Sequence, residues 1–341
     1  MPSQLLDDLN EPQRQAVVHS GTPLLVVAGA GSGKTRVLTR RIAYLMAERN
    51  AAPTEILAIT FTNKAANEMK ERVAHMVGPK ARSMWVSTFH SACVRILRNE
   101  AKRLNLKPSF TIYDTQDSVR MLSLVSKDLG IDPKSYSPKY LLGQISNLKN
   151  ELIDYEDAIS KAVTAQEQTV AQAYGEYQRR LMLASAVDFD DLIGHTVALL
   201  QAFPDVAEHY HRRFRHVLVD EYQDTNHAQY VLIRELVGNG KDGITPAELC
   251  VVGDADQSIY AFRGANIRNI VEFERDYSDA KTVVLEQNYR STQNILTSAN
   301  SVIEKNSGRP AKRLWTAEGS GEKIVIYTAN DEHHEADFIV T

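Results

Sequence analysis

One stretch decides the fold of this chain: residues 24–35 read LLVVAGAGSGKT. The run Leu24–Ala28 is apolar and of strand length, and a glycine-rich turn follows it, ending in Lys34 and Thr35. Such a turn between a buried strand and a helix directs backbone N–H groups at phosphate oxygens, beside the positive end of the helix. The stretch therefore predicts a phosphate-binding loop. Lys34 would supply charge for the β- and γ-phosphates and Thr35 a hydroxyl for Mg²⁺.

Apolar, β-branched runs of strand length recur along the chain and alternate with helical patterns. We expect strands at Leu24–Ala28, Ile56–Thr60, Trp85–Ser87, Val217–Asp220, Leu249–Gly253 and Thr282–Leu285. Helical patterns follow several of them, as at Lys34–Glu48 and Lys64–Val77. Short apolar strands that alternate with helices are typical of a parallel sheet covered on both faces. The predicted fold class is therefore α/β, with a doubly wound P-loop sheet.

Two regions depart from this alternation. Residues 111–186 show only helical patterns, at Gln116–Leu129, Pro138–Asn147 and Gln168–Ala184. Beyond Asn288 we expect a helix at Gln293–Lys305, a linker rich in Gly, Ser and Pro, a strand at Lys323–Tyr327 and the start of another helix. We therefore divide the chain into an α/β domain (1–110 and 187–285), an inserted all-helical subdomain (111–186) and the truncated start of another α/β domain (286–341).

An acidic pair follows a second buried strand, where residues 217–221 read VLVDE. Asp220 would hold Mg²⁺, and Glu221 would orient and deprotonate the attacking water. A guanine-specific site would need Asn-Lys-x-Asp, but residues 63–66 read NKAA and lack the carboxylate. A small-molecule kinase would not need the adjacent acidic pair. The residues thus favour ATP hydrolysis with Mg²⁺.

Charge is unevenly distributed along the chain. The net charge is −4, yet residues 61–107 hold ten Lys and Arg against three Asp and Glu, whereas residues 111–186 hold eight against ten. A basic strip on a mildly acidic body fits a groove for a polyanion, but it is equally typical of a solvated helix face. No apolar run approaches the ~20 residues of a membrane span, and residues 1–8 carry no signal-peptide pattern. We expect a cytoplasmic protein that does not associate with membranes.

Seven motifs, in order, resemble the UvrD/PcrA/Rep group of superfamily 1 DNA helicases. They are residues 9–13 (LNEPQ), 28–36 (AGAGSGKTR), 60–66 (TFTNKAA), 87–91 (STFHS), 220–224 (DEYQD), 252–260 (VGDADQSIY) and 287–292 (QNYRST). The resemblance covers essentially the whole chain. It implies an ATP-dependent DNA helicase with RecA-like motor domains, the second of them truncated.

The resemblance also implies roles for individual residues. Gln13 would read adenine, Tyr289 would stack on it, Gln257 would sense the γ-phosphate, and Arg290 would stabilise charge in the transition state. The phosphates would be bound by Gly29, Ala30, Gly31, Ser32, Gly33, Lys34, Thr35 and Arg36. Single-stranded DNA would stack on Phe61, Tyr260 and Phe262, and would be lined by Asn63, Lys64, Thr88, Phe89, His90 and Arg263. Relatives often carry Trp at the position of Phe262, so we expect weaker stacking there.

The resemblance implies movement in the 3′-to-5′ direction on single-stranded or 3′-tailed duplex DNA, in DNA repair or replication, alongside protein partners that the residues do not identify. We expect residues 1–341 to bind ATP weakly and not to unwind DNA alone. Two other classes stay open: a non-motor ATP-dependent switch on nucleic acid, and a module that only binds partners. RNA in place of DNA is a variant of the main hypothesis.

Overall fold

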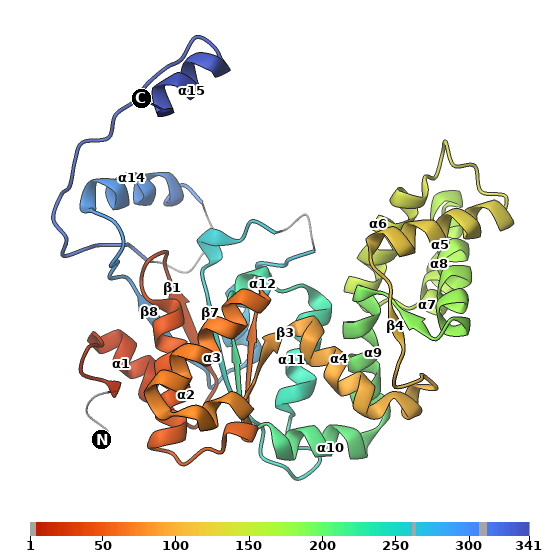
Figure 1. Ribbon diagram of the computed structural model, residues 1–341, viewed down its shortest axis with the longest axis horizontal. Helices are drawn as coiled ribbons and strands as arrows, with labels where there is room; N and C mark the ends of the chain where they lie inside the picture. The colour runs from red at the N-terminus through yellow and green to blue at the C-terminus, as the bar shows by residue number, and fades with distance from the viewer. Residues whose placement is uncertain (1–4, 261–263, 307–311, 341) are drawn as a thin grey trace.

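The computed structural model describes residues 5–260, 264–306 and 312–340 (Figure 1). At its centre is a six-stranded sheet in the order β3-β2-β6-β7-β1-β8, in which every neighbouring pair is parallel. The strands are β1 (Leu24–Ala28), β2 (Ile56–Thr60), β3 (Trp85–Thr88), β6 (His216–Val219), β7 (Glu248–Gly253) and β8 (Lys281–Leu285). Each lies within one residue of its predicted bounds. The predicted α/β class is confirmed.

Helices cover both faces of this sheet because successive strand residues point to opposite sides. In β1, Leu24 and Val26 join one apolar cluster, and Leu25 and Val27 join the other. The first cluster is completed by helices α1 (Glu11–Val18), α2 (Lys34–Ala47) and α3 (Asn63–Val77). The second is completed by α4 (Phe89–Glu100), α9 (Phe189–Ala202), α10 (Pro204–Arg213) and α11 (His227–Val237). The carboxyl ends of all six strands therefore meet at one edge, where ligands of open α/β sheets bind.

The segment 111–186, called the helical insertion below, has an apolar core of its own. Its helices are α5 (Thr115–Asp128), α6 (Pro138–Asn150), α7 (Tyr155–Lys161) and α8 (Ala165–Leu183). The expectation of helices alone was wrong in one detail. Strands β4 (Thr111–Ile112) and β5 (Ala186–Val187) pair in parallel where the chain enters and leaves the insertion. Strands of two residues are too short to show a period in the sequence.

A buried ion cluster joins the end of α6 to the start of α9. The Lys149 ammonium lies 2.7 Å from the Asp188 carboxylate and 2.7 Å from that of Asp191. The Tyr177 hydroxyl donates a further hydrogen bond to Asp188. Burial alone would lower the pKa of Lys149, but the charges of Asp191 and Asp188 raise that pKa above its usual range. The lysine therefore stays charged and pins the insertion to the sheet.

Replacing Lys149 with methionine is expected to lower the free energy of unfolding by about 3–5 kcal/mol. The substitution leaves two buried carboxylates without their cation, which costs more than loss of the pair itself. Urea denaturation of the chain measures the effect. The matched control is Lys161→Met, because Lys161 pairs with Asp157 on an exposed helix surface; an exposed pair contributes at most about 1 kcal/mol. An equal decrease in the free energy of unfolding in the two variants would contradict a structural role for the buried cluster.

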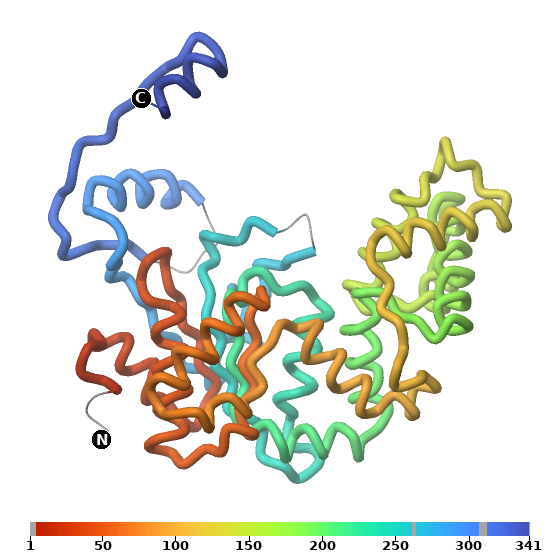
Figure 2. Tube along the Cα trace, viewed as in Figure 1, coloured from red at the N-terminus to blue at the C-terminus, as the bar shows by residue number. Residues whose placement is uncertain are grey.

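After β8 the chain continues into α14 (Gln293–Ile303) and ends in α15 (Glu332–Val340). Figure 2 shows the end of the trace, in dark blue, leading away from the rest of the chain, and Figure 1 labels its last helix as α15. The predicted strand at Lys323–Tyr327 is absent: these residues are exposed and adopt no regular structure. A strand needs a neighbour to satisfy its backbone groups, and no described strand lies beside this segment. Between β7 and β8 lie the short helices α12 (Arg268–Val271) and α13 (Phe273–Asp276). Within the described ranges, no helix is long and apolar enough to cross a membrane.

Candidate functional site

The predicted phosphate-binding loop connects β1 to α2 at the carboxyl edge of the sheet. Gly31 and Gly33 have left-handed backbone angles, with φ of 69° and 89°. A Cβ at Gly31 would lie 2.6 Å from the side-chain nitrogen of Asn288, and a Cβ at Gly33 would lie 2.8 Å from that of Gln13. Glycine is therefore required at both positions, by conformation and by the close approach of two distant side chains.

These two side chains brace the loop through hydrogen bonds to its carbonyls. The Gln13 amide donates to the Ser32 carbonyl at 2.9 Å, and its oxygen accepts from the Asn10 backbone. The Asn288 amide donates to the Ala30 carbonyl at 2.6 Å. Gln13 is fully buried, so its first function in this structure is to support the loop. Its predicted reading of adenine stays a prediction.

A cavity of about 540 Å³ opens over the loop. Parts of the chain that are far apart in sequence line it: Ala30, Gly31, Gly33, Lys34, Thr35, Arg36, Arg72, Glu221, Gln257, Tyr289 and Arg290. All four predicted catalytic residues are in this set. Arg72, on α3, was not predicted, because a lysine- and arginine-rich helix does not reveal which of its side chains faces a cavity. The cavity is large enough for a nucleotide triphosphate group surrounded by polar side chains.

The two halves of the predicted catalytic site meet at the floor of this cavity. The Lys34 ammonium lies 2.8 Å from the Glu221 carboxylate. Glu221 itself has a left-handed backbone, with φ of 50°, a conformation that costs a non-glycine residue energy and is found at functional sites. Gln223 holds the same carboxylate by donating a hydrogen bond of 3.0 Å. Lys34 and Glu221 can therefore face one triphosphate.

The carboxylates beside Glu221 suit a divalent cation. Burial, and then the charge of Glu221, raise the pKa of Asp220 to about 6 although Lys34 lowers it. Asp224 has a pKa raised to about 6 for the same two reasons, and one of its buried oxygens has no hydrogen-bond partner. Hard oxygen ligands of this kind fit Mg²⁺, which keeps several waters and shares its sites with phosphates. Among the described residues, no cluster of three or more His, Cys, Asp or Glu side chains could hold a metal. Asp220 and Thr35 would thus hold Mg²⁺ together with the substrate.

Two further segments complete the cavity. The Tyr289 backbone N–H donates to the Gly31 carbonyl at 3.0 Å, and its hydroxyl accepts from the Asn10 amide at 2.9 Å. Tyr289 is 44% exposed, as stacking on a base requires. Arg290 follows with its backbone N–H held by Asn288. Arg36, also in the lining, is anchored by a bond to the Asp8 carbonyl.

Gln257 ends the short 3₁₀ turn Ala255–Gln257 that follows β7, and its amide donates to the Asp254 carboxylate. The Lys312 ammonium contacts the same carboxylate and lies 2.6 Å from Asp256. The Asp254 backbone in turn donates to the Gln223 side chain at 2.9 Å. Gln223 therefore links Gln257 to Glu221. Lys312 was not predicted, since it stands in a linker whose position only the fold determines.

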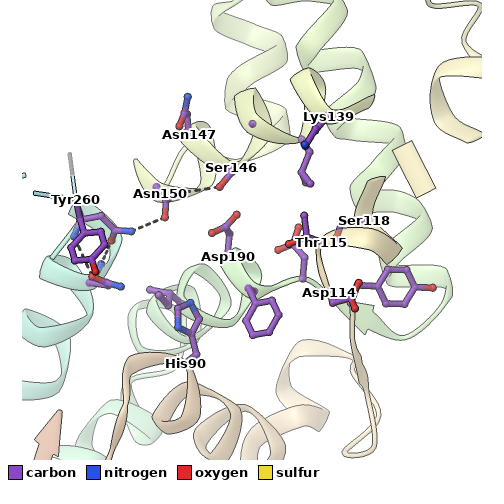
Figure 3. A pocket seen from close by; sticks show the side chains of 18 of the residues that line it. His90, Asp114, Thr115, Ser118, Lys139, Ser146, Asn147, Asn150, Asp190 and Tyr260 are labelled. Carbon is purple, nitrogen blue, oxygen red and sulfur yellow. Dashed lines mark hydrogen bonds between the residues drawn. The ribbon is translucent and has the colours of Figure 1, made fainter. Parts of the chain in front are cut away.

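A second cavity, of about 690 Å³, lies between the helical insertion and the carboxyl edge of the sheet (Figure 3). Three of the predicted DNA-contact residues line it: Phe61, His90 and Tyr260. The rings of Phe61 and Tyr260 stack with centroids 5.4 Å apart and an interplanar angle of 24°. His90 packs edge-on against Phe189 at 5.7 Å. Aromatic faces in a polar groove are typical of sites that bind single-stranded nucleic acid.

The other predicted DNA residues have different surroundings. Thr88 caps α4 by accepting from the Ser91 backbone, and Ser91 contacts Asn63. The Lys64 side chain is 87% exposed. Phe89 is only 3% exposed and packs in the apolar core. Its ring therefore cannot stack on a base, and its predicted contact with DNA does not fit this structure. Phe262 and Arg263 lie outside the described residues.

A glycine-rich loop, a lysine and an acidic pair around one cavity, on a parallel sheet, are the defining features of the P-loop nucleoside triphosphatase fold. Residues 9–278 match the family described as UvrD/REP helicase N-terminal domain, and residues 283–341 match UvrD-like helicase C-terminal domain. The chain belongs to the UvrD/REP helicase family, and its core is RecA-like.

Individual relatives agree with this assignment. The chain is 67% identical over 341 residues to ATP-dependent DNA helicase UvrD1 of Mycobacterium tuberculosis (strain ATCC 25618 / H37Rv), covering 98% of the chain and 44% of the relative. It is 64% identical over 345 residues to UvrD1 of Mycobacterium leprae, with the same coverage. Identity to ATP-dependent DNA helicase PcrA of Staphylococcus aureus (strain NCTC 8325 / PS 47) is 52% over 336 residues, covering 98% of the chain and 45% of the relative. The chain thus spans less than half the length of these relatives.

Proposed function

We propose that this chain is the ATP-binding part of a DNA helicase that hydrolyses Mg²⁺-ATP and moves 3′ to 5′ on single-stranded DNA, in DNA repair or replication. The observation that carries the proposal is the 2.8 Å contact between Lys34 and Glu221 in a cavity also lined by Gln257, Tyr289 and Arg290. One bound nucleotide could touch all five side chains. The names of the relatives support DNA as the substrate, and the resemblance supports the direction.

In the proposed reaction, the loop N–H groups and Lys34 bind the phosphates while Tyr289 stacks on the base. Mg²⁺, when bound, would neutralise charge that develops on the phosphate oxygens. Glu221 orients the attacking water and accepts its proton. Gln257 and Arg290 contact the γ-phosphate, and Arg290 stabilises the charge of the transition state. Gln223 bonds to the Glu221 carboxylate and to the Asp254 backbone, and the Asp254 carboxylate accepts from Gln257. Glu221 and Gln257 are therefore connected and respond to the same phosphate.

Single-stranded DNA would occupy the cavity beneath the helical insertion. Bases would stack on Phe61 and Tyr260 at about 1–3 kcal/mol each, and His90 would line the strand. Because Tyr260 follows Gln257 by three residues, movement at the γ-phosphate reaches the DNA directly. We assign residues 1–110 and 187–285 to the motor domain, 111–186 to an inserted subdomain and 286–341 to the start of a second motor domain. By this assignment, residues 1–341 bind nucleotide weakly and do not unwind DNA alone.

The test is ATP turnover by a protein that carries this chain together with a complete second motor domain, called the intact protein below. Oligo-dT is expected to raise the rate at least about tenfold, and oligo-U less. Streptavidin should be displaced from biotin at the 5′ end of a DNA strand, and not from the 3′ end. DNA-stimulated turnover without displacement from either end would favour a non-motor ATP-dependent switch. Turnover unaffected by any nucleic acid, or unwinding by residues 1–341 alone, would contradict the proposal.

A further inference from the structure

Three segments meet at a pair of asparagines beside the second cavity. The Asn226 amide donates a hydrogen bond of 2.7 Å to the Asn150 side-chain oxygen. Asn150 is the last residue of α6, in the helical insertion, whereas Asn226 precedes α11 on the sheet. Figure 3 shows Asn150 at the edge of the cavity, facing Tyr260, with its bonds dashed. A Cβ on Gly264, in the loop after Tyr260, would lie 3.8 Å from the Asn226 Cβ and 3.9 Å from the Asn150 Cβ.

Asn226 terminates the segment that carries the acidic pair. The chain runs from Asp220 and Glu221 through the short 3₁₀ turn Tyr222–Asp224 to Thr225 and Asn226. Gln223 ties this turn to Glu221. Asn226 is fixed at its end because its oxygen caps α11 by accepting from the Gln229 backbone at 2.9 Å. A displacement of Asn226 therefore reaches Glu221 through one short, hydrogen-bonded turn.

The loop that bears Tyr260 is joined to the same turn. The Asn266 backbone donates to the Thr225 carbonyl at 2.9 Å, and the Asn269 amide donates to the same carbonyl at 3.0 Å. The Thr225 side chain is fully buried. The segment that begins at Asn266 is therefore anchored to the acidic segment at Thr225, and the next residue, Asn226, anchors the end of α6 to the same place.

The insertion can act on the acidic segment because α6 borders the cavity along its length. Leu142, Gly143, Ser146, Asn147 and Asn150 all line the cavity. Lys149, the neighbour of Asn150, is clamped by Asp188 and Asp191 at the start of α9. The clamp fixes the end of α6 beside Asn150, so a ligand that contacts α6 along the cavity acts on the hydrogen bond between Asn150 and Asn226.

We propose that Asn150 is a positioning residue for ATP hydrolysis: its hydrogen bond to Asn226 connects occupancy of the second cavity by single-stranded DNA to the placement of Glu221. This inference rests on the proposed function. It assigns to the helical insertion a part in stimulating the ATPase, separate from the aromatic contacts. Asn150 acts through the acidic segment and needs no contact with nucleotide.

The experiment compares three variants of the intact protein at saturating oligo-dT, with the ratio of DNA-stimulated to DNA-free ATP turnover as the readout. Asn150→Leu removes the acceptor while keeping the side-chain shape, and is expected to lower the ratio about fivefold, as loss of one hydrogen bond predicts. Asn150→Asp keeps an oxygen acceptor and should restore the ratio to within about twofold. Saturating DNA removes any effect of the added charge on DNA affinity from this readout.

Gln172→Met is the matched control. Gln172 is exposed on α8 of the same insertion and lines neither cavity. We expect its ratio to stay within about twofold of that of the unmodified protein. If Asn150→Leu matches the unmodified protein, or if Asn150→Asp falls as far as Asn150→Leu, the inference is overturned while the proposed function stands. If the unmodified protein shows no stimulation by DNA, the proposed function itself fails.

Discussion

Replacing Lys34 with alanine is expected to lower ATP turnover of the intact protein by about 100- to 1,000-fold, because a fixed positive charge is removed from the point where phosphate charge develops. The Lys34 side chain is only 12% exposed, so water replaces its charge poorly. The substitution also removes the cation next to Glu221 and Asp220, which leaves two adjacent carboxylates to repel the triphosphate. Affinity for ATP should therefore fall together with turnover.

Steady-state ATP hydrolysis in the presence of oligo-dT measures turnover, and titration with a fluorescent ATP analogue measures affinity. Lys127→Ala provides the control, since Lys127 is exposed on the helical insertion, away from both cavities. It removes the same charge without touching either site. A Lys34→Ala protein that kept more than a tenth of the normal turnover would show that the loop lysine is not the principal phosphate contact.

The second large effect is expected from Glu221→Gln, which should lower turnover by about 10²- to 10⁴-fold, the usual contribution of a general base. Glutamine has the shape of glutamate but cannot accept the proton of the attacking water. Its side-chain oxygen can still accept a hydrogen bond from Lys34 or Gln223, so the cavity should keep its form. We expect affinity for the ATP analogue to stay within a few-fold of normal.

This pattern separates the two variants, because Lys34→Ala should lose affinity and turnover together whereas Glu221→Gln should lose turnover alone. The control is Glu335→Gln, on the exposed helix α15. Near-normal turnover in Glu221→Gln would remove the residue from water activation and leave another carboxylate, such as Asp224, to be tested in that role.

Local sequence patterns were sufficient to predict the strands of the central sheet. Runs such as Val217–Val219 are apolar and β-branched, and such runs form buried strands wherever helices can cover them. The Lys323–Tyr327 run has a similar pattern but is exposed and irregular. The two runs differ because only the first has neighbouring strands that pair with its backbone groups. The sequence of one segment does not state whether such a partner is present.

The aromatic residues also show that a local pattern does not specify the surroundings of a side chain. Phe61 and Phe89 both stand in motifs that the helicase resemblance assigns to DNA contact. The structure places Phe61 at the cavity, stacked on Tyr260, and Phe89 in the core. Phe89 begins α4 directly after β3, so its ring points between the sheet and its helices. The motif identified the segment correctly, but the direction of each side chain depends on where the helix lies against the sheet.

The sequence by itself determined the phosphate-binding loop, the acidic strand end and the order of strands and helices, because each depends on a few neighbouring residues and their backbone preferences. Only the tertiary structure decided that Lys34 and Glu221, 187 residues apart, lie 2.8 Å from each other. It also decided that Gln13 and Asn288 brace one loop, and that Asn150 reaches the acidic segment. Contacts between distant segments depend on the order of the strands within the sheet, β3-β2-β6-β7-β1-β8. No local pattern encodes this order, which differs from the order of the strands along the chain.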